Sequence, residues 1–281
     1  MKIITGMNTA SIEITVSGWD ELKNMFSEMC LNGWYFRGQA NKDWALSTTL
    51  ERTNMVLKEQ MLIRDFKRNA YQYLNEHTIP NSTIEWIALM QHHGAPTRLL
   101  DWTRSPYVAS FFAMNDKYDD AFSVLWAVNF QYLTGMTGNR FKDDNKYAVL
   151  KDSDYVKTHI MGEDDFLKIF MSQKYDENNL TPPMVLPVAP FVMNERLNIQ
   201  QGTFLCQTRL YDSSKLLSFE DNLFATFDGK LDTSYIIKIL IPADLRQEII
   251  IDLNYMNIND ATLFTNLDGF ARSLQKRLSV F

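Results

Sequence analysis

The order of strand-like and helix-like segments constrains the fold of this 281-residue chain most. Helical spacing of apolar residues predicts helices over Trp19–Leu31 and Ile84–His93. Apolar runs rich in strand-forming residues predict strands over Ile12–Val16, Ala121–Phe130 and Ser234–Ile241. These segments do not alternate strictly, as a doubly wound α/β fold requires. We therefore predict an α+β fold, a single compact domain with a mixed or antiparallel sheet flanked by helices.

Local signals mark several ends of these elements. Ser17 lies three residues before Asp20 and predicts a capping-box-like start for the first helix, and Ser82 with Glu85 forms the same pattern before a second helix. Gly94 predicts the end of that second helix. The remaining predicted elements are a strand at Trp34–Phe36 that breaks at Gly38, one or two helices within Leu50–Leu74, a helix from Ser105–Pro106, an extended stretch at Pro182–Val192, a strand at Gly202–Leu210, and helices near Leu245–Leu253 and Leu267–Leu278.

The chain contains neither an internal repeat nor a low-complexity linker. We predict an N-terminal strand region over residues 1–17 and one domain over residues 18–281. A polar, acidic stretch near residues 131–181 carries few structural signals and is interpreted as an insertion.

Charge and composition exclude several classes of protein. The formal net charge of −6 is unfavourable for general nucleic-acid binding, which depends on neutralising phosphates, although a local basic cleft remains compatible with it. Two cysteines provide neither a metal cluster nor a disulfide framework, and we expect two buried, reduced thiols. We find no secretory signal and no apolar stretch of the ~20 residues that a membrane span needs. The sequence therefore predicts a cytoplasmic protein without a membrane partner.

The first candidate motif is Tyr35–Gln39, where an apolar strand delivers Arg37 beside Gly38. A planar guanidinium binds phosphate or carboxylate through two hydrogen bonds. Glycine lets the backbone turn or lets a ligand approach closely. The alternative is a surface Arg37 paired with one acidic residue.

The second candidate motif is Gln91–Arg104, which contains two His, two Arg, an Asp and a Trp. We interpret it as a connector between two helices, and polar groups concentrated on such a connector indicate a site. The alternative is that Asp101 pairs with Arg98 or Arg104 and that one His caps a helix end. Neighbouring His92 and His93 would point about 100° apart on a helix, so we expect no metal site there.

The third candidate motif, Asn194–Arg196 followed by Gln200–Phe204, enters a strand through Gly202. Glu195, Gln200 or Gln201 would accept hydrogen bonds from ligand hydroxyls, whereas the alternative is an ordinary loop at a strand edge. We find no P-loop, no dinucleotide-binding glycine pattern, no nucleophile elbow and no metalloprotease helix.

Together these segments resemble the FRG-domain family. The family's (F/Y)RG motif corresponds to Phe36–Gly38, and its long Q-H-(Y/H)-G-x-P-T-R-L-L-D-W-T motif corresponds to Gln91–Thr103. An R-x-x-x-Q-x-G-x-F pattern begins at Arg196, and Leu263–Ala271 is similar to the family's L-F-P-D-L-D-G-x-A, with Thr265-Asn266 in place of Pro-Asp. The resemblance covers about residues 18–278. Members of the family are often associated with mobile elements and defence against phage.

The order of a strand with Arg, a polar mid-chain segment and a late strand with Gln loosely resembles the ADP-ribosyltransferase layout. Our leading hypothesis is therefore an NAD-dependent ADP-ribosyltransferase-like effector in bacterial conflict or phage defence, with NAD as substrate and no metal. Its oxocarbenium-like reaction centre would be stabilised by an acidic or amide group. The hypothesis assigns catalytic roles to His92, Arg37, Gln200 and Glu195, and binding roles to Tyr35, Gly38, Gln39, Gln91, Arg98, Asp101, Trp102 and Arg104.

Two other functions use the same residues. A sensor or regulatory module would bind a nucleotide or a phosphorylated RNA end without turnover. A metal-independent nuclease or phosphotransferase would use His92 as its acid or base, since histidine titrates near neutral pH. In each case the partner is a nucleotide-like small molecule. A protein or nucleic-acid target is expected, as is an antitoxin or regulatory partner.

Overall fold

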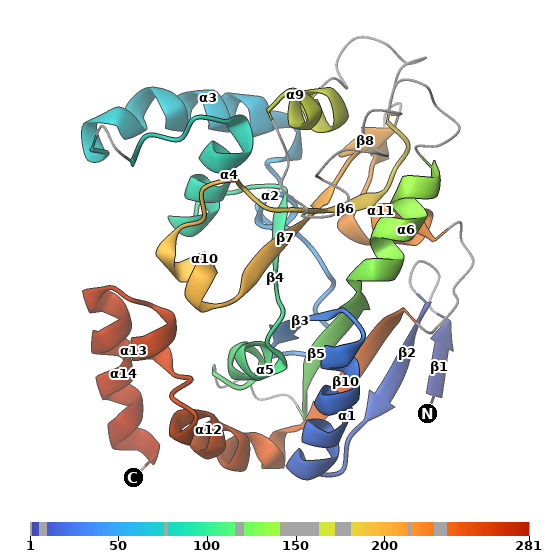
Figure 1. Cartoon of the computed structure of the whole chain (residues 1–281), viewed down its shortest axis with the longest axis vertical. Helices are drawn as coiled ribbons and strands as arrows, with labels where there is room; N and C mark the ends of the chain where they lie inside the picture. The colour runs from blue at the N-terminus through green and yellow to red at the C-terminus, as the bar shows by residue number, and fades with distance from the viewer. Residues whose placement is uncertain are drawn as a thin grey trace.

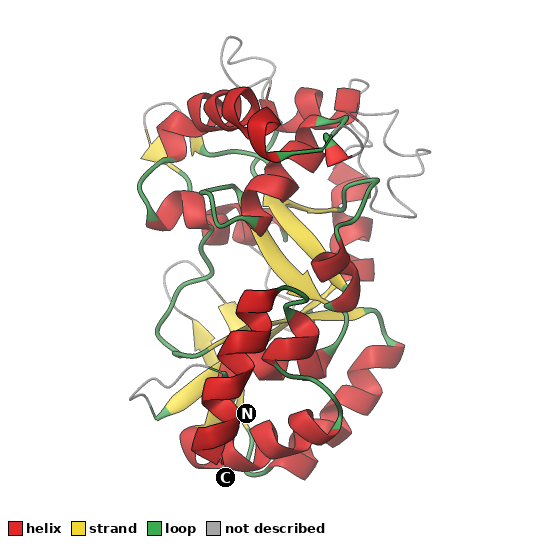
Figure 2. Cartoon of the chain, turned by 90° about the vertical axis from the view of Figure 1, so that its left-hand side faces the viewer, coloured by secondary structure: helices red, strands yellow, loops and turns green. Residues whose placement is uncertain are grey.

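The computed structural model describes residues 2–5, 10–75, 78–115, 121–140, 163–171, 181–212, 215–227 and 235–280. Within these ranges, eight strands form one mixed sheet in the order β1-β2-β10-β5-β3-β4-β7-β6, with helices around it in a single compact fold (Figure 1 and Figure 2). The predicted α+β class with a mixed, helix-flanked sheet is confirmed. Most of the insertion predicted near residues 131–181 lies outside the described residues, and the division at residue 18 stays a prediction.

The strands of the sheet are β1 (Lys2–Thr5), β2 (Ala10–Thr15), β3 (Trp34–Gln39), β4 (Leu99–Thr103), β5 (Phe122–Asn129), β6 (Val185–Val188), β7 (Gly202–Gln207) and β10 (Ile236–Pro242). A separate ribbon pairs β8 (Tyr211–Asp212) with β9 (Lys215–Leu216). The α-helices are α1 (Trp19–Leu31), α2 (Thr49–Arg52), α3 (Glu59–Ala70), α4 (Thr83–His92), α5 (Pro106–Met114), α6 (Phe130–Arg140), α9 (Glu163–Phe166), α10 (Glu195–Ile199), α11 (Phe219–Thr226), α12 (Arg246–Tyr255), α13 (Asp260–Leu263) and α14 (Leu267–Val280). Shorter turns are the 3₁₀ helices η1 (Val56–Lys58), η2 (Tyr71–Tyr73) and η7 (Ala243–Leu245) and the π-helix η5 (Leu167–Met171).

Helices cover both faces of the sheet. On one face, α1, α5 and α12 pack over β3, β5 and β10, around buried side chains such as Phe26, Phe36 and Ile239. On the other face, α6 and α11 pack over a cluster that draws Trp126 from β5 and Trp102 from β4. This second cluster therefore joins the two halves of the sheet. Helices α3, α4 and α9 cover the remaining face of β4, β7 and β6 (Figure 1).

The two halves meet at a weak join between β3 and β4. Their ladder has one described pair, Phe36 with Thr103, whereas β3 pairs with β5 over six residues. In a continuous antiparallel ladder, Gly38 would lie opposite Asp101. Instead, the Arg37 side chain donates from Nη1 to the Asp101 carbonyl oxygen at 2.9 Å. The strands separate beyond this pair, and the opening becomes the candidate site.

The helix ends largely follow their predicted signals. Ser82 and Glu85 form the predicted capping box of α4, and Gly94 follows the helix with φ +78°. The first helix begins as predicted at Trp19, but its N-cap is Gly18. Ser17 instead donates from its backbone N and its Oγ to Glu21 Oε2, both at 2.7 Å. The predicted Ser17 cap is therefore wrong, because its hydroxyl bonds a side chain instead of the helix backbone.

The prediction of a connector between the helices that are now α4 and α5 is also wrong. Leu99–Thr103 forms β4, an inner strand paired with β3 on one side and β7 on the other. Its side chains alternate between the two faces, so Leu99 joins the core beneath α4 while Leu100 and Trp102 join the core beneath α6 and α11. The polar residues of this motif are consequently held on a rigid strand.

Gly38 has a packing role that its sequence context did not reveal. Strand β3 continues through it to Gln39, which corrects the predicted strand break. A Cβ at Gly38 would lie 2.0 Å from the Ala109 carbonyl oxygen and 2.5 Å from the Ala113 backbone N. Glycine is required because the backbone of α5 lies directly against the strand. The residue therefore brings helix and strand together, and it also lines the pocket described below.

Arg98 forms a buried ion pair with Glu59 from α3. The Arg98 Nε donates to Glu59 Oε1 at 2.5 Å, Nη2 bonds the other carboxylate oxygen, and Nη1 donates to the Phe170 carbonyl at 3.1 Å. The two residues are 2% and 5% exposed. The proposed pairing of Arg98 with Asp101 is wrong, because the guanidinium turns into the core beneath α3.

The two cysteines lie in different environments. Cys206 is buried in β7, and burial raises the pKa of its thiol. Cys30 is exposed on α1, so the expectation of two buried thiols is wrong for this residue.

We predict that Gly38→Ala lowers the free energy of unfolding by about 1–3 kcal/mol, because the added methyl overlaps the α5 backbone. Urea denaturation followed by circular dichroism measures the effect. Gly135→Ala on α6 is the matched control: a Cβ there has no neighbour within 4 Å, and alanine favours the helix by about 0.5–1 kcal/mol. Equal stability of Gly38→Ala and the unmodified protein would contradict the packing role.

We also predict that Glu59→Leu destabilises the protein by about 3–5 kcal/mol, because it leaves the Arg98 charge buried without its partner. The double variant Glu59→Leu/Arg98→Met restores most of this loss, because it removes both charges. Asp20→Asn, at an exposed ion pair with Lys23, is the control and costs under about 1 kcal/mol. Denaturation midpoints decide the comparison, and a double variant as unstable as Glu59→Leu refutes the prediction.

Candidate functional site

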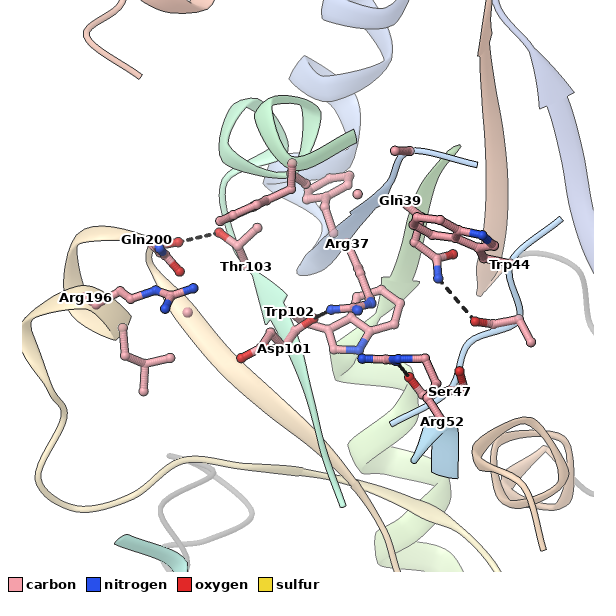
Figure 3. A pocket seen from close by; sticks show the side chains of 18 of the residues that line it. Arg37, Gln39, Trp44, Ser47, Arg52, Asp101, Trp102, Thr103, Arg196 and Gln200 are labelled. Atoms are coloured by element: carbon pink, nitrogen blue, oxygen red, sulfur yellow. Dashed lines mark hydrogen bonds between the residues drawn. The ribbon is translucent and has the colours of Figure 1, made fainter. Parts of the chain in front are cut away.

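A pocket of about 690 Å³ occupies the opening between β3 and β4. Its walls come from the end of β3, the loop that follows it, α2, β4, α5 and α10 (Figure 3). The polar or aromatic lining residues are Phe36, Arg37, Gln39, Asp43, Trp44, Ser47, Arg52, Asp101, Trp102, Thr103, Phe112, Arg196 and Gln200. Three guanidinium groups and two carboxylates thus line one pocket.

Arg37 lies at the base of the opening. Its side chain is partly exposed, but its Nε is buried and has no hydrogen-bond partner among the described residues. Burial lowers the pKa of Arg37 below its ordinary value, nearby Arg52 lowers it further, and Asp101 acts in the opposite direction. No described carboxylate lies within ion-pair distance of Arg37. The predicted surface ion pair is therefore absent from the described structure.

Arg52 and Trp102 complete this end of the pocket. Arg52, at the end of α2, donates from Nη1 to the Ser47 carbonyl and from Nη2 to Thr49 Oγ1 at 3.1 Å. Trp102 is 2% exposed, and its Nε1 also has no acceptor among the described residues. Figure 3 draws its indole beside the guanidinium groups of Arg37 and Arg52.

Asp101 presents an oriented carboxylate to the pocket. Gln91 donates from Nε2 to Asp101 Oδ2 at 2.8 Å, and Gln91 Oε1 accepts from Thr97 Oγ1 at 2.5 Å. Thr97 Oγ1 also accepts from the Leu99 backbone N at 3.2 Å. Asp101 is exposed and has no described ion-pair partner. Three residues of the long motif therefore fix one carboxylate at the edge of β4.

Gln39 serves the wall of the pocket. Its Nε2 donates to the Ala45 carbonyl at 3.2 Å, and its Oε1 accepts from Trp126 Nε1 at 2.7 Å. The amide is buried and both of its ends are bonded. Gln39 therefore ties the loop that carries Trp44 to the sheet.

The opposite end of the pocket is built on the C-terminal helices. Arg196 of α10 lies over the Phe264 ring, with its guanidinium carbon 4.6 Å from the centroid, and Arg272 lies 4.5 Å from the same centroid. Gln200 donates from Nε2 to the Leu263 carbonyl at 3.0 Å. Burial lowers the pKa of Arg196, Asp101 raises it and Arg272 lowers it. The C-terminal motif thus positions two pocket residues.

A Gly269 Cβ would lie 2.1 Å from the Phe264 carbonyl, so glycine lets α14 approach this ring. Asn266, which replaces the family's Asp, accepts from the Gly269 backbone N at 2.9 Å. This side-chain bond satisfies one backbone donor of the first turn of α14.

His92 lines a smaller adjoining cavity of about 50 Å³, which shares Asp101, Arg196 and Gln200 with the main pocket. Burial lowers the pKa of His92, and both His93 and Arg196 act in the same direction. The lowered pKa favours the neutral form of the imidazole. His92 and Gln91 border only this smaller cavity.

Other predicted site residues lie elsewhere. Tyr35 stacks on Phe130, with ring centroids 3.7 Å apart, and does not line either cavity. Glu195 is exposed in the first turn of α10, Arg104 is exposed after β4, and Arg98 is buried beneath α3. None of these three borders the two cavities, so the roles predicted for them do not enter the proposal below.

The structure also adds residues to which the sequence assigned no role. Arg52 and Trp44 line the main pocket without belonging to a recognised motif, Phe112 lines it from the helix that follows the long motif, and Arg196 belongs to the third motif. Trp44 and Arg52 follow β3 closely, and this proximity along the chain was the one available signal. Phe112 comes from α5, which only the fold places beside β3.

Within the described ranges, no group of three or more His, Cys, Asp or Glu side chains is arranged to hold a metal ion. In the same ranges, every helix is too short or too polar to cross a bilayer.

Residues 32–121 match a family model described as the FRG domain. No curated protein and no solved structure matches the chain. The matched residues include Arg37, Arg52, Asp101 and Trp102, whereas Arg196 lies outside them. The predicted resemblance is confirmed for the first two motifs, which lie within the matched residues, and the chain contains an FRG domain.

Proposed function

We propose that the main pocket binds a phosphate-bearing nucleotide, and that the protein uses NAD as substrate to transfer ADP-ribose to an acceptor. The observation that carries this proposal is the single oriented carboxylate of β4, Asp101, in a pocket with three guanidinium groups. Guanidinium groups would bind the phosphates of NAD, and a carboxylate would stabilise the positive charge that develops on its ribose.

The volume and charge of the pocket support a nucleotide. Ligand pockets commonly enclose about 300–1,000 Å³, and this one encloses about 690 Å³. Arg37, Arg52 and Arg196 concentrate positive charge in a chain of net charge −6. Guanidinium groups match phosphate oxygens in geometry and charge. Trp44, Trp102 and Phe112 provide aromatic surface for a flat ring.

The reaction breaks the bond between nicotinamide and ribose C1′. Its electron pair leaves with the nicotinamide, and positive charge develops on the ribose. A carboxylate held nearby stabilises that charge, because its orientation is fixed before the reaction begins. Asp101 fits this role through its bond to Gln91, whereas Glu195 lines neither cavity. An acceptor nucleophile then forms the new bond to C1′ and loses its proton.

Phosphate-ester chemistry is less favoured by this arrangement. It requires His92 beside the phosphate-binding groups, but of the three pocket arginines only Arg196 shares the small cavity with His92, while Arg37 and Arg52 line the main pocket. A nucleotide sensor remains the alternative that turnover measurements distinguish.

We predict that Asp101→Asn slows nicotinamide release from NAD by about 100-fold or more while NAD binding changes little, because the carboxylate acts mainly on the developing charge. Purified protein is incubated with ADP-ribose-labelled NAD and a bacterial lysate. Released nicotinamide and label on protein or nucleic acid are both measured. Label on protein or on nucleic acid identifies which of the two accepts the ADP-ribose.

Arg64→Ala is the control, because Arg64 is an exposed residue of α3 whose described polar contact is with neighbouring Asp65. It should release nicotinamide at the unmodified rate. If the unmodified protein binds NAD but releases no nicotinamide, the sensor hypothesis replaces the transferase hypothesis. Equal release by Asp101→Asn and the unmodified protein would exclude Asp101 from the reaction.

A further inference from the structure

Two buried N–H groups at the same end of the main pocket have no acceptor among the described residues. They are Arg37 Nε on β3 and Trp102 Nε1 on β4. Buried donors in folded proteins are almost always hydrogen-bonded, and an exception at a pocket indicates a place for a bound acceptor. Because these two donors come from different strands, they meet only where β3 and β4 separate.

A second observation concerns charge. Arg52 approaches Arg37 closely enough to lower its pKa, although no described carboxylate lies within ion-pair distance of either guanidinium. The side chain of Arg52 is held toward this end by its bonds to Ser47 and Thr49. Two cations kept near each other repel, and an anion between them relieves that repulsion.

We propose that Arg37, Arg52 and Trp102 form an anion clamp that binds phosphate oxygens of the ligand. The inference rests on the proposed function only in taking the phosphate to belong to a nucleotide. The two arginines supply charge, and the neutral indole supplies one fixed donor that selects the position of a single oxygen. A phosphate group suits three donors from different directions, because its oxygens are arranged tetrahedrally.

The clamp also sets the direction of the ligand. Neighbouring side chains on a strand point to opposite faces, so Trp102 faces the α6 and α11 side while the Asp101 carboxylate meets Gln91 of α4. A nucleotide with its phosphate in the clamp therefore extends between the strands toward Asp101 and Arg196 (Figure 3). The phosphates and the reacting ribose occupy opposite ends of the pocket.

The test is calorimetric titration of the full chain with ADP, pyrophosphate, inorganic phosphate and adenosine. Trp102→Phe keeps an aromatic ring and removes the N–H, while Arg52→Gln removes the charge at a surface position. Each variant should bind ADP and pyrophosphate about tenfold or more weakly, since hydrogen bonds to charged groups have this magnitude. Adenosine, which lacks phosphate, should bind all proteins equally.

Two controls keep the proposal open to refutation. Trp86→Phe changes a buried tryptophan of α4 outside the pocket, and Arg64→Gln changes an exposed arginine of α3; both should bind as the unmodified protein does. Unchanged ADP and pyrophosphate binding by Trp102→Phe and Arg52→Gln overturns the clamp. These ligands have no nicotinamide bond, so the result is independent of whether NAD is consumed. If phosphate alone binds as tightly as ADP, the clamp stands and its ligand is the free anion.

Discussion

The hydrogen bond from Arg37 to the Asp101 carbonyl bridges the sheet at the point where the backbone ladder between its two halves stops. Strands β3 and β4 share one described backbone pair, and this side chain spans the gap where the ladder stops. An exposed sheet edge at this place would leave backbone donors and acceptors unpaired. Arg37 satisfies one of them, the Asp101 carbonyl. The same guanidinium therefore serves the fold and forms the base of the pocket.

The residues of the long motif have different roles because successive side chains of β4 point to opposite faces of the sheet. Leu99, Leu100 and Trp102 enter the cores on the two faces of the strand. Asp101 remains exposed at the opening between β3 and β4. A ligand-binding side chain on a strand is held more rigidly than one on a loop. Thr97 and Gln91 extend this rigidity to the carboxylate itself. The motif is dense in polar residues because it builds both an ion pair in the core and a site at the surface.

The sequence predicted the helix limits well where the signal is local. The capping box at Ser82 and the glycine at Gly94 act within a few residues of the helix they end. It did not predict β4, because five residues interrupted by Asp101 give little periodicity, and pairing with β3 and β7 decides their conformation. The need for glycine at Gly38 comes from α5, about seventy residues away along the chain, and no local pattern contains that information.

The site was predicted in its parts but not in its geometry, and the C-terminal helices explain why. Arg37, Asp101, Trp102 and Gln200 do meet in one pocket, whereas Arg98 turns into the core. Arg196 becomes a pocket residue because Phe264 lies beneath its guanidinium. The contact between this ring and α14 in turn requires Gly269, because a larger residue there would overlap the Phe264 backbone. The C-terminal segment thus positions the Arg196 guanidinium at one end of the pocket, while β3 and α2 position those of Arg37 and Arg52 at the other. A ligand that contacts Arg37 of β3 and Asp101 of β4 would bridge the weak join between these strands. Its binding would then be energetically coupled to the relative position of the two halves of the sheet.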